Sequence, residues 1–423
     1  MAENCQAALD RSEEINVRLK KARVLGWEKK YEASIKEYQK ILEKEEIKKV
    51  RLEMESKEAY WNKKVKQAIK AYGPLLEIEP KNLEARFDLS QIYCYQNMWE
   101  EAERENKEII AISPEHFRAK EALKKIELIA QHISLNSGYD FFQAESDDRN
   151  TDIKRHLFFN NLKIPLTYRL FLDLNYNHTL RKFSDWDDLK ENKLGFNIFY
   201  FKRPDFNLSF FYNFLKYNQE IKSCDLYGAD INIRILDRGE LLLKYAKENL
   251  VNSSTVIRER YYADNFVINL SADLNRKLRI GLNYLYSCIS DDNIKNEPEI
   301  YLAYYFSLEP KRFYIQYRYK YQSFDKEVLE YFSPGSFKTH ILSFNWRHFL
   351  NAEEIFFGAD DLYYDFIYDL AFDSENVFSH HLKVELHKDV NKSFNINLKV
   401  GITFSDNNIY EDKNLILSFK IYF

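Results

Sequence analysis

The histidines near the C-terminal end have the spacing that comes closest to a catalytic group. His380, His381 and His387 lie with Glu385 in the segment SHHLKVELHKD. On an extended strand His381, Glu385 and His387 would share one face and span about 20 Å at roughly 3.3 Å per residue. Catalytic groups must lie within hydrogen-bonding reach of one another, so this spacing is too wide for a single centre. The sequence has no nucleophile elbow, phosphate-binding loop or H-E-x-x-H motif. We therefore expect no enzymatic activity and no cofactor.

Cysteine spacing and net charge argue against two further classes of function. Cys5, Cys94, Cys224 and Cys288 show no C-x-x-C or other metal-ligand spacing, so we expect isolated thiols and no metal. The net charge is −4, which gives no general affinity for nucleic acid.

The composition is aromatic but contains no long apolar run. Phe and Tyr contribute 32 and 31 residues, and charged residues make up 30% of the 423. A membrane helix needs roughly 20 consecutive apolar residues, which no segment supplies, whereas a membrane barrel hides its apolar residues in alternation. Residues 1–4 show no basic segment leading into an apolar core, so we expect an exported chain to be a mature form.

The first 130 residues show a repeat of 34 residues. Pro80 and Pro114 are separated by this period, as are Ala68 and Ala102, with Ser34 one period earlier. This is the period of tetratricopeptide repeats, in which small residues allow close helix contact and proline ends the second helix. We expect three helix pairs within 22–42, 59–80 and 88–114, and a capping helix over 115–130. A generic helical bundle is the alternative.

From His132 onward the apolar period is two instead of helical. In 393–405, apolar residues occupy every second position from Phe394 to Phe404, with polar residues between them. The segment KRFYIQYRYKYQ repeats the pattern, which is typical of strands with one apolar face. The connections alternate between seven short turns, such as KIPLT and LNAEE, and eight longer polar segments, such as SDDNIKNEPE. This predicts sixteen antiparallel strands in 131–423 closed as a transmembrane β-barrel, with a soluble β-sandwich as the alternative.

The chain ends on the strand-like segment NLILSFKIYF. It resembles the terminal strand of Gram-negative outer-membrane proteins, whose final aromatic residue, here Phe423, is read by the barrel-assembly machinery. SLNSGYDFF at the expected first strand and Tyr331-Phe332-Ser333-Pro334 in the sixth long loop extend the resemblance to the YaiO-type outer-membrane β-barrel family. The domain order is also similar to that of exporters of cellulose and poly-N-acetylglucosamine. The resemblance implies that 131–423 lie in outer-membrane lipid and that 1–130 lie in the periplasm, docking a protein partner.

The inward parity of the expected strands carries an excess of basic residues. Nine basic residues share it: Arg169, Arg234, Lys244, Arg279, Arg318, Lys320, Lys383, Lys399 and Lys420. Four acidic residues share it: Asp173, Asp230, Asp273 and Glu385. A sixteen-stranded barrel is wide enough for an aqueous channel, so these residues either line a positive path or pair across the interior. Inward aromatic residues would offer stacking faces for sugar rings: Phe171, Phe199, Phe201, Phe211, Tyr217 and Tyr314.

Two functions follow from these expectations. The first is a channel for export of a surface or secreted polysaccharide, with the repeats docking a periplasmic partner. The second is a non-conducting barrel that anchors the repeats or displays loops.

Overall fold

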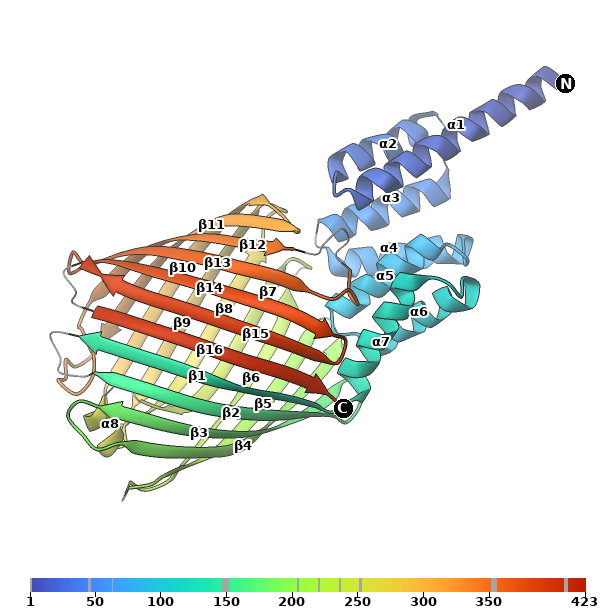
Figure 1. Cartoon of the computed structure of the whole chain (residues 1–423). Helices are drawn as coiled ribbons and strands as arrows, with labels where there is room; N and C mark the ends of the chain where they lie inside the picture. Colours follow the sequence, from blue (N-terminus) through green and yellow to red (C-terminus); the bar gives the residue numbers. More distant parts are fainter. Residues whose placement is uncertain are drawn as a thin grey trace. The chain divides into compact units, whose positions relative to one another are not determined.

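The computed structural model describes residues 2–44, 47–62, 64–146, 152–203, 205–219, 221–235, 237–250, 253–350, 356–406 and 410–423, with the backbone alone for 2–12, 146 and 203. These residues form seven helices followed by a closed barrel of sixteen antiparallel strands (Figure 1). The predicted order, a helical repeat region and then a sixteen-stranded barrel, is confirmed.

The seven helices repeat as pairs. Their bounds are α1 (Ala2–Trp27), α2 (Tyr31–Lys44), α3 (Lys48–Trp61), α4 (Val65–Ile78), α5 (Leu83–Tyr95), α6 (Trp99–Ile112) and α7 (Phe117–Gln131). The second helices of the pairs, α2, α4 and α6, begin at Tyr31, Val65 and Trp99 and therefore keep the period of the sequence. α7 is the helix expected to cap the repeats.

The repeat positions predicted from the sequence are buried where the helices pack against one another. Ala68 and Ala102 have no exposed surface, and neither has Ser34 one period earlier. Pro80 lies two residues after α4 ends and Pro114 two residues after α6 ends, where a missing backbone N–H costs no helix bond.

A buried network of charged side chains joins α1, α2, α3 and α5. Glu53 of α3 accepts two hydrogen bonds of 2.7 Å from Arg23 of α1 and one of 2.7 Å from Tyr38 of α2. Lys57, one turn further along α3, donates to Glu84 and Asp88 of α5 at 2.6 and 2.7 Å. Because Glu53 and Lys57 are each only 3% exposed, these pairs fix how α3 packs between its neighbours.

The barrel strands are long and pair only with their neighbours in sequence, apart from the closure. Their bounds are β1 (Ser134–Ser146), β2 (Ile153–Pro165), β3 (Leu170–Phe183), β4 (Leu189–Arg203), β5 (Phe206–Tyr217), β6 (Cys224–Ile235), β7 (Gly239–Asn249), β8 (Tyr262–Asp273), β9 (Leu278–Ile289), β10 (Ile294–Ser307), β11 (Lys311–Phe324), β12 (Phe337–Phe349), β13 (Leu362–Asp373), β14 (Phe378–Asn391), β15 (Phe394–Ser405) and β16 (Tyr410–Tyr422). β1 pairs with β16, from Ser134 opposite Tyr422 to Ser146 opposite Tyr410, so no strand edge is left open.

The lengths of several connections differ from the sequence expectation, and two of them differ most clearly in kind. LNAEE was predicted to be a short turn, but β12 ends at Phe349 and β13 begins at Leu362, so the connection covers 350–361. SDDNIKNEPE was predicted to be a long loop, but β10 already begins at Ile294. Lys295, Glu297 and Glu299 make this segment look like a loop in the sequence, but they lie on the inner face of β10. We name the rim that carries the start of β1 and the end of β16 the turn rim, and the opposite one the loop rim.

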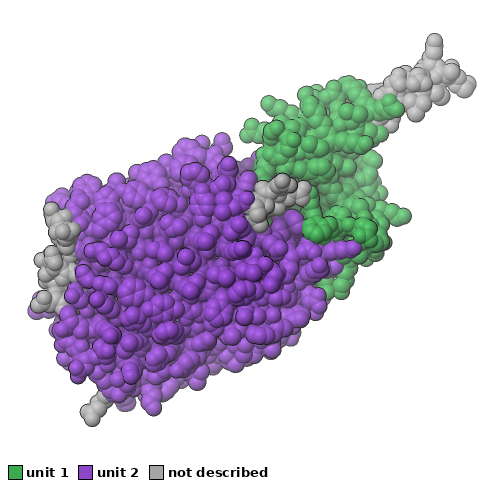
Figure 2. All heavy atoms as spheres, viewed as in Figure 1, with its two compact units in different colours: residues 1–95, 101–119 green, residues 96–100, 120–423 purple. Residues whose placement is uncertain are grey.

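The chain divides into two compact units, residues 1–95 with 101–119 and residues 96–100 with 120–423 (Figure 2). The second unit contains the barrel, the short helix α8 (Ser254–Arg258) between β7 and β8, and residues 120–131 of α7.

Candidate functional site

Every barrel strand separates an apolar outer face from a polar inner face. Large apolar side chains of one parity are exposed on the outside, among them Leu194 (61%), Phe306 (55%) and Phe158 (51%). Cross-strand partners in antiparallel sheets point to the same side, and the pairing around the ring extends these two faces to all sixteen strands. The polar interior is therefore the candidate functional site.

The aromatic residues predicted to point inward lie on the inner face. Phe171, Phe199, Phe211 and Tyr217 lie on β3 to β5, and Tyr314 lies on β11 opposite Tyr305. Not all of them are free to stack on a ligand. Phe171 is 1% exposed, packs edge-on against Phe201 and lies under the Lys163 ammonium.

The inner face is balanced in charge. Its basic side chains on the described strands are Arg155, Lys163, Arg181, Lys193, Arg234, Lys244, Arg279, Lys295, Arg312, Arg318, Lys320, Arg347, Lys383, Lys399 and Lys420. Its acidic side chains are equal in number: Asp140, Asp173, Glu191, Asp230, Glu240, Glu248, Asp273, Glu297, Glu299, Asp365, Asp369, Asp373, Glu385, Asp389 and Asp412. The basic excess counted from sequence was wrong, because several acidic partners lie in segments that were assigned to turns or loops.

Arg318, Lys320 and Lys399 each have a carboxylate partner of their own on the inner wall. The guanidinium of Arg318 lies 3.2 Å from Asp369, two strands away. The ammonium of Lys320 lies 2.8 Å from Glu297. That of Lys399 lies 3.2 Å from Glu385. Such pairs cancel one another's long-range field while leaving polar groups in place.

The other predicted lumen residues divide into three cases. Arg234 and Arg279 both approach Glu240, at 3.9 and 3.2 Å. Lys383 and Lys420 lie on the inner face, and Lys420 sits over the Tyr422 ring at 4.5 Å. Arg169 is an exception, because β3 begins at Leu170; it lies in the preceding turn, where its guanidinium is 3.4 Å from Glu100.

The histidines of β14 do not form one group. His380 points outward and contacts Tyr368 and Phe404, whereas His381 and His387 point inward. His387 stacks on Tyr363 and lies 3.0 Å from Asp389. Among the described residues no cluster of three or more His, Cys, Asp or Glu side chains could hold a metal ion.

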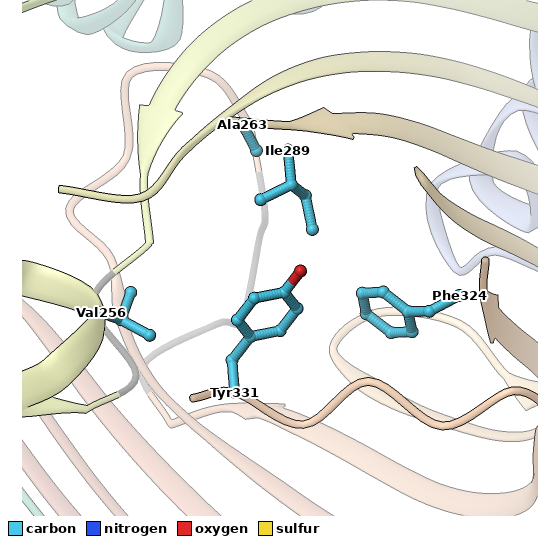
Figure 3. Packing of buried hydrophobic residues seen from close by; sticks show 5 residues of the cluster. All are labelled: Val256, Ala263, Ile289, Phe324 and Tyr331. Atoms are coloured by element: carbon cyan, nitrogen blue, oxygen red, sulfur yellow. The ribbon is translucent and has the colours of Figure 1, made fainter. Parts of the chain in front are cut away.

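A short helix lies inside the barrel at the loop rim. In α8, Val256 packs with Ala263, Ile289, Phe324 and Tyr331 (Figure 3). Ala263, Ile289 and Phe324 are inner-face residues of β8, β9 and β11, so this contact places α8 against that wall. The sequence offers one signal for α8: the Ser253 hydroxyl accepts a hydrogen bond from the Val256 N–H and caps the helix. Five residues are too few for a helical period to be visible.

Residues 325–336, between β11 and β12, hold α8 in position. Figure 3 shows the Tyr331 ring between Val256 and Phe324, and its hydroxyl bonds to Asp291 and to the fully buried Asn293. Ser253 donates to the Glu330 carbonyl at 2.9 Å. We call α8 together with 325–336 the loop plug. Tyr331 and Ser333 of the YFSP segment singled out in the sequence are buried in it.

Residues 120–131 of α7 contact the turn rim. The ammonium of Lys125 lies 3.6 Å from Asp361, and that of Lys392 lies 3.0 Å from Glu121. Gly358 has a φ of +113°, and a Cβ there would lie 2.6 Å from the Ala122 nitrogen. Only glycine suits such a close approach in that conformation.

Comparison with known proteins supports both parts of the fold. A tetratricopeptide repeat model matches residues 62–126. A solved bacterial polysaccharide outer membrane secretin is similar to the barrel with a TM-score of 0.57 and 9% identity, over 70% of this chain and 99% of the secretin. Pseudomonas aeruginosa OpdO matches with a TM-score of 0.40 and 10% identity, over 69% and 97%. No curated protein is detectably similar in sequence.

The chain therefore has tetratricopeptide helices followed by a sixteen-stranded barrel of the outer-membrane type. In the described part of the chain, no helix is long and apolar enough to cross a membrane.

Proposed function

We propose that the protein is an outer-membrane channel through which a surface or secreted polysaccharide leaves the cell, and that it belongs to the YaiO-type family. The observation that carries the proposal is the reversal of polarity on all sixteen strands, with exposed apolar side chains outside and charged or amide side chains inside. Lipid favours the first face and a water-filled path favours the second. The fold shared with a polysaccharide secretin supports an extended polar cargo.

The connectivity of the chain supports an orientation for the proposed channel. α7 ends at Gln131 and β1 begins at Ser134, so the chain passes from the last helix into the first strand at the turn rim. Outer-membrane barrels keep their tight turns in the periplasm, which supports a periplasmic location for the repeats, where they would dock a protein partner. The β16 strand ending at Phe423 is the segment offered to the barrel-assembly machinery. The proposal assigns no catalytic step, cofactor or nucleic acid to the chain.

The loop plug favours a second function. An apolar helix packed inside the loop rim suits a closed barrel that anchors the repeats and displays loops. Current through purified full-length protein in planar lipid bilayers separates the two functions. Discrete conductance steps support the channel. A barrel that inserts but passes no current under any applied voltage, even after the loop plug has been disrupted by substitution, supports the anchor.

A further inference from the structure

One row of inner-face residues is nearly all asparagine. Direct cross-strand pairs connect Asn395 to Lys420, Lys420 to Asn136, Asn136 to Asn161, Asn161 to Asn175, Asn175 to Gly195 and Gly195 to Asn213. The row runs from β15 through the β16–β1 closure to β5. We call its five asparagines, at positions 136, 161, 175, 213 and 395, the asparagine row. Lys420 is the one charged residue within it, and the row ends at Asp389 of β14 on one side and at Leu226 of β6 on the other.

The amides of the asparagine row are not used by the fold. None of the five hydrogen-bonds to another side chain or to the backbone of the described residues, whereas Asn397 on the neighbouring row donates to Glu385 at 2.8 Å. Asn175 is 7% exposed, and its buried Oδ1 meets no donor among those residues. A buried acceptor without a partner is costly, so such groups in native proteins usually have a ligand, water or functional reason.

Gly195 keeps the row open where it crosses β4. A Cβ at this position would lie 2.2 Å from Oδ1 of Asn213 and 2.3 Å from the Tyr212 carbonyl. Glycine normally weakens a strand interior and marks a place where another group approaches closely. Here it gives the Asn213 amide the space that a side chain would otherwise fill.

We propose that the asparagine row is a binding track for the hydroxyl groups of an uncharged glycan inside the barrel. Each amide offers a donor and an acceptor, which match the paired donor and acceptor character of a sugar hydroxyl. The balanced inner charge gives no net potential to attract a polyanion. Contacts that exchange one amide–water bond for one amide–hydroxyl bond are individually weak, as a path that must also release its cargo requires. This inference rests on the proposed export function and names its substrate class.

Binding of maltohexaose tests the track without requiring transport. Full-length protein in lauryldimethylamine oxide, whose head group contains no sugar, is titrated with maltohexaose and with hexagalacturonate by saturation-transfer NMR. We expect maltohexaose to bind and hexagalacturonate to bind at least about tenfold more weakly. Replacing both Asn161→Ala and Asn175→Ala should raise the maltohexaose Kd about tenfold, because two amide contacts are lost.

The barrel supplies a matched control pair. Asn269 and Asn283 also face inward directly opposite each other on β8 and β9, and Oδ1 of Asn283 likewise meets no donor among the described residues, but they form a row of only two asparagines, flanked by Leu242 and Glu299. The double variant Asn269→Ala and Asn283→Ala should leave the Kd within about twofold.

If Asn161→Ala and Asn175→Ala prevent folding, as judged by heat-modifiable gel migration, the serine variants replace them. Three results would contradict the proposed binding track: an equal loss of maltohexaose affinity in both double variants, equal binding of hexagalacturonate and maltohexaose, or no binding of maltohexaose. If the barrel conducts but shows any of these results, the channel proposal stands and only the glycan-binding track is rejected. If maltohexaose binding depends on the asparagine row but the barrel does not conduct, the export function is rejected instead.

Discussion

Val256 and Ile257 are adjacent residues of α8 that pack against two different walls of the barrel interior. Val256 contacts the cluster that contains Ile289 and Phe324, on β9 and β11. Ile257 contacts the cluster that contains Leu189 and Leu215, on β4 and β5. One short helix therefore connects wall segments several strands apart and narrows the interior at the loop rim.

Disrupting both contacts should open the barrel. In the double variant Val256→Asp and Ile257→Asp, two carboxylates would have to be desolvated in apolar clusters, which is strongly unfavourable. We expect α8 to leave the interior and single-channel conductance in planar bilayers to rise severalfold. Glu259→Gln, an exposed change one residue after the helix, is the control and should conduct as the wild type does. An unchanged conductance in the double variant would show that α8 does not restrict the path.

The paired inner charges predict ion selectivity. The wild-type barrel should be nearly non-selective in a KCl gradient, because acidic and basic side chains on the inner face balance. Replacing Arg318→Gln, Lys320→Gln and Lys399→Gln together leaves Asp369, Glu297 and Glu385 without these partners. The reversal potential should then shift toward cation selectivity.

A paired substitution controls for this effect. Lys399→Gln combined with Glu385→Gln removes both members of one ion pair and should leave the reversal potential close to that of the wild type. A wild-type barrel with clear anion selectivity would contradict the balanced interior.

Glu53 should stabilise the helical repeats strongly. Burial alone would raise the pKa of Glu53, but the hydrogen bond from Arg23 and the charge of Lys57 hold it below the ordinary value of 4.5. Its contribution is thus present above about pH 4.5 and is lost as the pH falls through the lowered pKa. Glu53→Gln leaves Arg23 without its charged partner and should cost about 3 to 5 kcal/mol at neutral pH.

Urea unfolding of the full chain, followed by circular dichroism at a helix-sensitive wavelength, measures this loss. Glu58→Gln makes the same chemical change at an exposed position of α3 and should cost less than about 0.5 kcal/mol. Equal midpoints for the two variants would mean that the network does not stabilise the helices.

Phe423 should matter for assembly more than a large apolar loop residue that is even more exposed. Phe423 is 64% exposed at the end of the strand that pairs with β1, and Leu329 in the loop plug is 101% exposed. Phe423→Ala should lower the amount of folded protein in the outer membrane severalfold, because the free β16 must be recognised before the barrel closes. Leu329→Ala should not, and equal levels of the two variants would contradict the assembly role.

Periodicity in the sequence was sufficient for the fold but not for the interior. Ala68 and Ala102 mark the helical repeat because only small side chains fit at these fully buried positions, and the alternation from Phe394 to Phe404 is visible because successive residues of a strand lie on opposite faces of the barrel wall. The inward position of Glu297 and Glu240 could not be predicted, since polar residues near the end of a strand have the sequence pattern of a loop or turn. Tyr331 was visible as part of a motif, but its contact with Val256 depends on which loops meet in space.

Movement of an uncharged glycan through the barrel is the most direct test of the proposed function. Liposomes containing the full chain with Val256→Asp and Ile257→Asp are loaded with labelled maltohexaose or labelled hexagalacturonate, and the release of each is followed over time. The account predicts that maltohexaose is released faster than from protein-free liposomes. Hexagalacturonate should be released more slowly than maltohexaose from the same protein-containing liposomes. Retention of both sugars by liposomes that contain correctly folded barrels would contradict it.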